Sequence, residues 1–118
     1  MPAVHTQRLS IPVPGGKQID ELIGAASTQT RDISIAHMVA PAGWTEPFQT
    51  PAFREYTVVL RGTVTVEHDG RTFECHAGET LVTEPGERIR YGVGPDGAEY
   101  IAICLPAFTP ESVHREAE

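Results

Sequence analysis

The sequence predicts an all-β domain in which two packed sheets form a jelly roll or a small barrel. From Arg31 onward, residues alternate with a period of two, and Gly- and Pro-containing turns separate the alternating runs. The chain holds 11 Gly and 10 Pro, as is typical of many short strands joined by tight turns. Its 118 residues are enough to bury the core of one domain without disulfides or a structural metal.

The chain divides into three predicted regions. Residues 1–30 form a proline-punctuated N-terminal arm, and the spacing of apolar residues within 18–27 allows one short helical turn. Residues 31–107 form the barrel. Residues 108–118 form a C-terminal tail, in which Thr109 and Pro110 are suited to begin a short acidic helix.

Alternating runs predict the strands of the barrel, at residues 31–40, 55–61, 63–68, 71–76, 79–83, 87–93 and 98–105. Asp69-Gly70 predicts a two-residue hairpin turn, because both central positions of such a turn need positive φ. This hairpin sets His68 opposite Arg71 and His76 opposite Thr63, so the two histidines are not expected to form a pair. Further turns are predicted at 84–86 and 94–97.

Charge and composition restrict the classes of partner. The formal net charge of −7 and the pI near 5.1 argue against binding to nucleic acid or an anionic membrane, since both favour a basic surface. The first residues lack the apolar segment of a signal peptide, and no apolar run approaches the roughly 20 residues of a spanning helix. We therefore expect a cytoplasmic protein. Cys75 and Cys104 lie in apolar runs, which favours buried free thiols over a disulfide.

The stretch from Pro41 to Gly62 combines a loop rich in Pro and aromatic residues with a strand headed by Glu55. Such a loop opening onto a strand end is a natural mouth for a cavity. Gly43, Glu55 and Gly62 have the spacing of the first motif of the small single-domain cupins, a double-stranded β-helix family that the chain resembles from residue 33 to residue 106. Gly78 and the turn at 84–86 match the second motif. The resemblance implies a cupin barrel, and a homodimer joined by a strand edge or by the N-terminal arm.

The resemblance also marks the positions that usually hold a metal in cupins. Gln49 and Pro51 replace the two histidines of the first motif, and Ile89 replaces the histidine of the second. Only Glu55 remains of the four usual ligands. Because iron, manganese and zinc need imidazole or carboxylate donors, we expect no metal and no other cofactor. In this respect the chain distantly resembles the ethanolamine-utilisation cupins.

Glu55 is the leading candidate for chemistry. Thr57 and Val59 share its strand face, so an inward Glu55 would be partly desolvated and would serve as a general base or as an acceptor that orients a substrate. The alternative is a carboxylate at the cavity mouth, paired with Arg54 or Arg88. The sequence leaves both alternatives open.

The remaining candidates are ligand-binding residues. Gln49 occupies a motif position, and Tyr91 faces inward to bond either a ligand or Glu55, or simply fills the core. His37 shares a face with aliphatic residues and is either a core histidine or a replacement ligand. Trp44 and Phe48 crowd the mouth, where they line an apolar pocket or form a lid or a dimer contact.

These observations favour a cupin barrel that binds or acts on a small, mostly apolar metabolite in a metal-poor cavity, with Glu55 as the acid–base or orienting group. One alternative is a metal-dependent dioxygenase or isomerase with His37, Gln49 and Glu55 as a rearranged ligand set. Another is a non-catalytic binding or accessory module. The sequence leaves open whether the protein is an enzyme.

Overall fold

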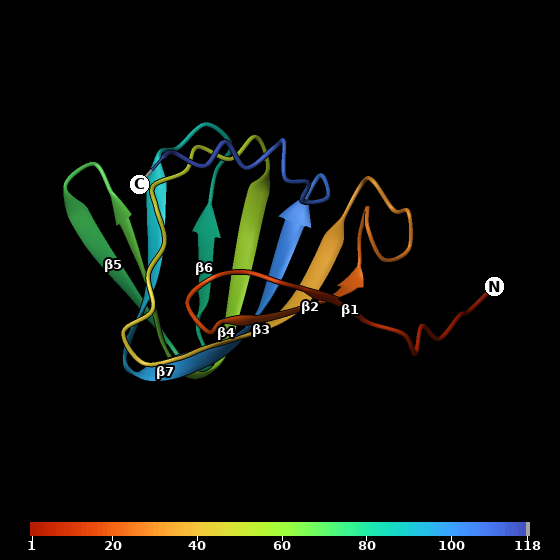
Figure 1. Ribbon diagram of the computed structural model, residues 1–118, viewed down its shortest axis with the longest axis horizontal. Helices are drawn as coiled ribbons and strands as arrows, with labels where there is room; N and C mark the ends of the chain where they lie inside the picture. Colours follow the sequence, from red (N-terminus) through yellow and green to blue (C-terminus); the bar gives the residue numbers. More distant parts are fainter. Residues whose placement is uncertain (118) are drawn as a thin grey trace.

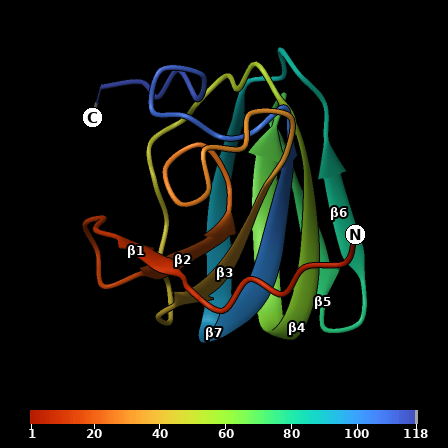
Figure 2. The same ribbon diagram turned by 90° about the vertical axis from the view of Figure 1, so that its right-hand side faces the viewer.

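The computed structural model describes residues 1–117 and is built from β-strands (Figures 1 and 2). The strands are β1 (Leu9–Ile11), β2 (Gln18–Ile23), β3 (Ser34–Ala40), β4 (Arg54–His68), β5 (Arg71–His76), β6 (Thr80–Thr83) and β7 (Ile89–Leu105). Within the described part of the chain, no helix is long and apolar enough to cross a membrane. The predicted all-β jelly-roll class is confirmed.

The long antiparallel ribbon of β4 and β7 joins the two walls of the barrel. The first half of β4, from Arg54 to Gly62, pairs with the end of β7, and its second half pairs with the start of β7. On the first wall, β6 pairs with β4, while β3, β2 and β1 follow β7 in order. On the second wall, β5 pairs with β4. One ribbon therefore belongs to both walls.

The predicted break at Gly62 and the predicted turn at 94–97 are wrong, because both strands continue through these positions. The register of the ribbon shifts on either side of Gly62, and Gly62 and Gly97 have positive φ values of 78° and 72°. A Cβ atom on Gly62 would overlap the carbonyl oxygen of Gly97. The two glycines therefore let the ribbon bend where the sequence pattern predicts that it ends.

Replacing Gly62 by alanine is expected to destabilise the fold by about 3 kcal/mol or more, because backbone overlap adds to the penalty of a positive φ. Gly70 is a matched control, since it also has a positive φ, of 75°, but an added Cβ atom there would meet nothing within 4 Å. Gly70→Ala should lower the free energy of unfolding by only about 1 kcal/mol. Urea unfolding of both variants measures the difference, and equal losses would contradict a close contact at the bend.

The predicted helical turn within 18–27 is also wrong, since residues 18–23 form β2. Gln18 pairs with Val39 and Asp20 with His37 on the edge of β3. Pairing on a free strand edge satisfies the backbone N–H and C=O groups of a segment too short to form a stable helix alone. The N-terminal arm thus contributes strands β1 and β2 to the first wall.

The C-terminal tail contains no helix over residues 108–117, contrary to expectation. It lies along the loop before β4 instead. The amide of Glu116 donates to the carbonyl of Phe48 at 2.8 Å, and the amide of Ala52 donates to the carbonyl of Ser112 at 2.9 Å. The tail therefore closes one end of the barrel.

The hairpin between β4 and β5 follows the prediction. Asp69 and Gly70 have φ values of 52° and 75°. His68 pairs with Arg71, and His76 pairs with Thr63. Cys75 and Cys104 are buried and free, as predicted.

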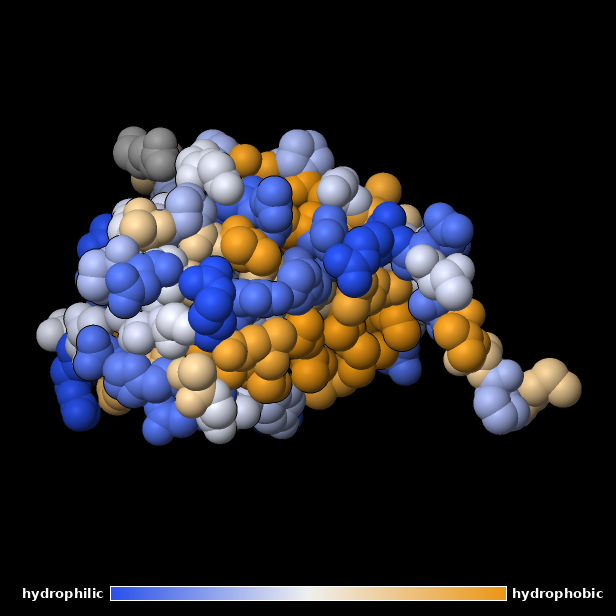
Figure 3. Space-filling view, turned by 90° about the horizontal axis from the view of Figure 1, so that it is seen from below, coloured by the Kyte–Doolittle hydropathy of each residue, from blue (hydrophilic) through white to orange (hydrophobic). Residues whose placement is uncertain are grey.

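A broad apolar face covers the outside of the first wall (Figure 3). Because Ala36 and Ala102 are buried and line the interior, the alternating residues Ile35, Ile101 and Ile103 point outward. Their neighbours Leu60 and Val82 are 51% and 44% exposed. An exposed apolar face of this kind is typical of a contact surface.

Candidate functional site

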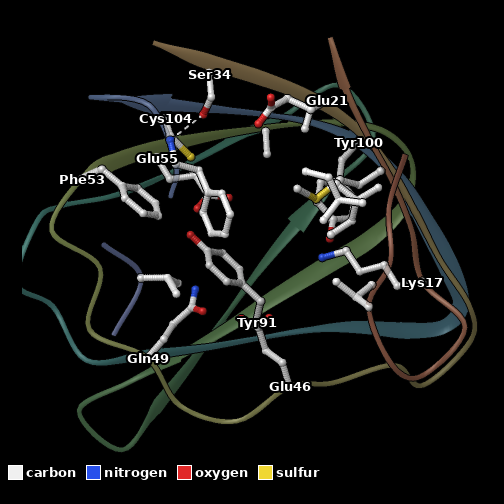
Figure 4. A pocket seen from close by; sticks show the side chains of 18 of the residues that line it. Lys17, Glu21, Ser34, Glu46, Gln49, Phe53, Glu55, Tyr91, Tyr100 and Cys104 are labelled. Carbon is white, nitrogen blue, oxygen red and sulfur yellow. Dashed lines mark hydrogen bonds between the residues drawn. The ribbon is translucent and has the colours of Figure 1, made fainter. Parts of the chain in front are cut away.

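A cavity of about 100 Å³ lies inside the barrel, between the strands, the N-terminal arm and the C-terminal tail (Figure 4). Its apolar lining includes Ile11, Val13, Phe53, Phe108 and Val113. Its polar lining includes Lys17, Glu46, Gln49, Glu55, Tyr91 and Tyr100. A few polar groups in a mostly apolar cavity are what a small-molecule site needs to orient its ligand.

A wider hollow of about 540 Å³ adjoins the cavity and shares part of its wall. The shared residues are Val13, Lys17, Ile19, Glu46 and Arg115. The exposed residues Pro14 and Thr45 lie on the rim of the hollow. A ligand that enters through the hollow therefore passes Lys17 and Glu46 before it reaches the inner cavity.

Glu55 lines the inner cavity but not the wider hollow. It is buried, and the register of β4 places it opposite Thr83 of β6 and Cys104 of β7. Burial raises the pKa of Glu55 from 4.5 to about 7, while the positive charge of Lys17 lowers it and the negative charge of Glu46 raises it. A carboxyl group with this pKa can donate or accept a proton near neutral pH.

The arginines that could have paired with Glu55 bind other carboxylates. Arg54 Nε donates to Glu84 Oε1 at 2.7 Å, and Arg88 Nε donates to Glu116 Oε2 at 2.6 Å. None of the ion pairs among residues 1–117 includes Glu55. Of the two alternatives left open by the sequence, the structure agrees with the inward carboxylate.

Tyr91 and Gln49 also face the cavity. The Tyr91 hydroxyl lies 2.8 Å from Thr83 Oγ1, and burial followed by the negative charge of Glu55 raises the pKa of Tyr91 well above its usual value. Gln49 exchanges two backbone hydrogen bonds of 2.8 Å with Ile89. Arg115 Nη2 donates to Gln49 Oε1 at 3.3 Å. The structure thus brings Glu55, Tyr91 and Gln49 to one cavity.

Lys17 lies between two aromatic rings where the cavity meets the hollow. Its Nζ atom is 4.1 Å from the ring centroid of Trp44 and 5.3 Å from that of Tyr100. Burial lowers the pKa of Lys17 from 10.5 to about 8, although the negative charges of Glu46 and Glu55 oppose the change. This amine is therefore a weaker base than an exposed lysine.

Glu46 is the carboxyl group at this junction, and its side chain is mostly buried. Its Oε1 atom lies 3.5 Å from Arg115 Nη2, while its buried Oε2 atom has no hydrogen-bond partner within the described residues. Burial raises the pKa of Glu46, and the charges of Lys17 and Arg115 lower it. A ligand with a donor group would satisfy the free oxygen atom.

Neither Lys17 nor Glu46 is among the residues predicted from the sequence. Both lie in segments without a strand period, so no alternation assigns their side chains to a face. One signal was present, because Lys17 is the only lysine in the sequence.

The structure corrects the expectations for His37 and Phe48, which lie outside the cavity lining. His37 Nε2 lies 2.7 Å from Glu99 Oε2 on the outer side of β3, because the small residues of that strand, Ser34 and Ala36, face inward instead of the aliphatic ones. Phe48 precedes the inward Gln49 and therefore points out, with its ring centroid 3.9 Å from Arg88 Cζ.

Trp44 lies on the wall of the wider hollow, not on that of the inner cavity. Its indole ring covers Lys17 there. The predicted position at the mouth is therefore the observed one, whereas contact with a ligand remains a prediction.

The residues at the usual cupin metal position do not fit a transition metal. Glu55 supplies one carboxylate and Gln49 one amide oxygen, and His37 is on the far face of β3. Among residues 1–117, no group of three or more His, Cys, Asp or Glu side chains is arranged to hold a metal ion. Such metals prefer several imidazole or carboxylate donors, so the donor set gives no basis for metal chemistry.

Solved structures share this architecture. An RmlC-like cupin from Shewanella frigidimarina matches with a TM-score of 0.71 at 17% identity, covering 89% of each chain. The EutQ protein of Clostridium difficile matches with a TM-score of 0.60 at 22% identity, covering 80% of this chain and 72% of that one. At these identities the matches show the fold, which is that of a small cupin domain.

One curated protein is similar in sequence. The endoribonuclease YbeY of Myxococcus xanthus is 44% identical over 107 residues, which make up 90% of this chain and 36% of that protein. The chain therefore spans only about a third of the length of this relative.

A family model described as the AraC-like ligand binding domain matches residues 54–118. The match covers β4 to β7 and the C-terminal tail, which supply Glu55, Tyr91 and the wall formed by Phe108 and Val113. The chain is thus a small cupin domain that belongs to the family of AraC-like ligand-binding domains.

Proposed function

We propose that the protein binds a small, mostly apolar ligand in the inner cavity and that Glu55 is the acid–base or orienting group for it. The observation that carries the proposal is a buried carboxyl group, unpaired with any cation of residues 1–117, on the wall of a cavity that adjoins a wider hollow. Its raised pKa keeps a proton available near neutral pH. Tyr91 and Gln49 would hold the polar end of the ligand.

The size of the cavity restricts the ligand. An apolar cavity of about 150 Å³ in another protein is large enough for benzene, and the inner cavity here has about 100 Å³. The ligand therefore has a compact apolar body, and any longer part of it would extend into the wider hollow. Burying such a body favours binding by about 25 cal/mol per Å² of apolar surface.

Three probes with one branched apolar body test this proposal: isovalerate, isovaleraldehyde and isoamyl alcohol. We expect at least one to raise the melting temperature of the protein, because a ligand that binds only the folded state stabilises it by about 2.7 kcal/mol at 100 times its Kd. Glu55→Gln keeps the shape of the side chain but cannot exchange a proton. This variant is expected to lose the shift.

Glu74→Gln is the matched control, since Glu74 is exposed on β5 and makes the same chemical change outside the cavity. It should respond to the probes as the unchanged protein does. Equal probe binding by Glu55→Gln and the unchanged protein would contradict the role of Glu55. No shift with any of the three probes would contradict a compact apolar ligand.

A second candidate is a sensing module without catalysis of its own. The Myxococcus relative supports it, because the similar segment is only 36% of a longer protein named as an endoribonuclease. In such a protein the cupin domain would bind a small ligand while another part acts on RNA. The net charge of −7 disfavours direct contact of this domain with RNA. Tight binding of a probe that is recovered chemically unchanged would favour this candidate.

The homodimer also stays a prediction. The apolar outer face of β3, β4 and β7 supports self-association better than the strand edge or the N-terminal arm does, because burying such a face removes more apolar surface from water. A cytoplasmic location likewise stays an expectation from the sequence.

A further inference from the structure

Lys17 provides the only lysine amine of the chain, and it lies at the junction of the inner cavity and the wider hollow. The other strongly basic side chains of the sequence are arginines. Arginine is always protonated in proteins, whereas a buried lysine can become neutral and act as a nucleophile. The single lysine therefore places a possible nucleophile where the inner cavity meets the wider hollow.

The surroundings of Lys17 leave its amine available to a ligand. None of the hydrogen-bonded side-chain pairs or ion pairs among residues 1–117 includes it. The rings of Trp44 and Tyr100 shield it from water, and Figure 4 shows its nitrogen pointing into the space that Tyr91 also faces. A ligand in the cavity would meet this nitrogen directly.

We propose that Lys17 captures the carbonyl group of a small apolar aldehyde or ketone as an imine. The neutral amine adds to the carbonyl carbon, so an N–C bond forms, the C–O π bond breaks, and one N–H proton is transferred to the carbonyl oxygen to give the carbinolamine. The C–O bond of the carbinolamine then breaks, and the hydroxyl group leaves as water with the second N–H proton as the C=N bond forms. One carbonyl compound and one amine thus give one imine and one water, with no oxidant or reductant.

Two carboxyl groups are placed to carry these protons. Glu46 lies with Lys17 on the wall shared by the cavity and the hollow, and its Oε2 atom is buried without a hydrogen-bond partner in the described chain. Glu55 lines the inner cavity, where the carbonyl oxygen would lie once the apolar body is buried. Burial raises the pKa of both groups, and the value of about 7 for Glu55 keeps its protonated form available near neutral pH.

This inference rests on the proposed function, because it takes the same cavity to be the binding site and names aldehydes and ketones as the ligand class. The charged groups that shift the pKa of Lys17 are Glu46, Glu55 and Arg115, and the phenol of Tyr100 is a further titratable group beside it. The two carboxylates favour the protonated amine, whereas burial and Arg115 favour the neutral nucleophile. Burial prevails and lowers the pKa to about 8, so more of the amine is neutral and nucleophilic than in an exposed lysine.

Reductive trapping of the 118-residue chain tests the proposal. The protein is incubated with isovaleraldehyde and cyanoborohydride at about pH 8, where the pKa of Lys17 leaves about half of its amine neutral. Peptide mass spectrometry then measures the reduced adduct on Lys17 and on the α-amine of Met1, which is fully exposed and serves as the internal control. We expect Lys17 to react at least about tenfold faster, since a bound carbonyl reacts as an intramolecular partner.

Isoamyl alcohol provides a control that needs no variant. It shares the apolar body of the aldehyde but cannot form an imine, so it should suppress labelling of Lys17 and leave labelling of Met1 unchanged. Lys17→Arg keeps the positive charge and should show an adduct on Met1 alone. If Lys17→Arg still binds the aldehyde normally but no longer forms the adduct at position 17, the amine of Lys17 is the group that forms the imine.

The outcomes separate this inference from the proposed function. If isoamyl alcohol or isovalerate stabilises the protein but Lys17 reacts no faster than Met1, the imine is overturned and the binding cavity stands. If Lys17 forms an adduct that isoamyl alcohol does not suppress, reaction is independent of the cavity and the inference is overturned as well. Rapid, alcohol-sensitive labelling of Lys17 alone supports it.

Discussion

Replacing Phe53 by alanine is expected to lower the free energy of unfolding by about 3–5 kcal/mol, the usual range for a buried Phe→Ala change. Phe53 is 2% exposed, and its ring packs edge-on against Phe108 with centroids 6.0 Å apart. Val113 completes the same cluster. The substitution would therefore remove the side chain that anchors the tail over the cavity, and chemical denaturation measures the loss.

Phe73 is the matched control for this prediction. It is 39% exposed on β5, where its ring centroid lies 5.0 Å from Arg71 Cζ. The same Phe→Ala change there should cost less than about 1 kcal/mol, since it removes an exposed side chain. If both variants lose equal stability, Phe53 does not hold the tail, and the closed end of the barrel has another source of stability.

The strand pattern of the barrel could be predicted from the sequence because alternation and turn residues are local signals. The hairpin at Asp69-Gly70 is the clearest case, because two adjacent residues of types that tolerate positive φ are enough to predict the turn. The bend at Gly62 could not be predicted in this way. The bend is caused by the close approach of Gly97, which is distant in sequence. A prediction from local residue types therefore places a strand end at each glycine.

The helices predicted near the two termini were wrong for a related reason. β2 forms because β3 presents a free edge, and the tail lies flat because residues 48–52 offer hydrogen-bond partners. Both partners come from elsewhere in the chain. A weak local tendency to form a helix is overridden wherever such partners exist.

For the candidate site, alternation of residues was sufficient to predict which side chains of the regular strands face the cavity. It gave no such prediction for residues outside the strands. Glu55 and Tyr91 face the cavity because their strand faces were clear. His37 was misplaced because its strand has an aliphatic face and a small-residue face, and the small one packs inward beside the cavity. Lys17 and Glu46 come from irregular segments whose paths only the folded chain defines.

The stability advantage of Glu55→Gln over the unchanged protein is expected to grow as the pH rises from about 5 to about 7.5. Burial raises the pKa of Glu55 from 4.5 to about 7. The folded state therefore retains a proton that the unfolded chain has already released, and the stability present below about 4.5 is lost progressively up to about 7. At 1.36 kcal/mol for each pH unit between the two values, the full loss is about 3 kcal/mol.

Glutamine stays neutral at every pH, so the variant avoids this loss and should be the more stable protein above neutral pH. Lys17 does not obscure the effect, because its lowered pKa of about 8 adds stability only as the pH rises further, from about 8 toward 10.5. Melting temperatures at several pH values, with Glu74→Gln as the exposed control, measure the trend. A difference between Glu55→Gln and the unchanged protein that stays constant from about pH 5 to about pH 7.5 would show that Glu55 titrates as an exposed carboxylate. Such a carboxylate would hold no proton for a ligand near neutral pH. That result would contradict both the pH dependence of stability and the acid–base role of Glu55.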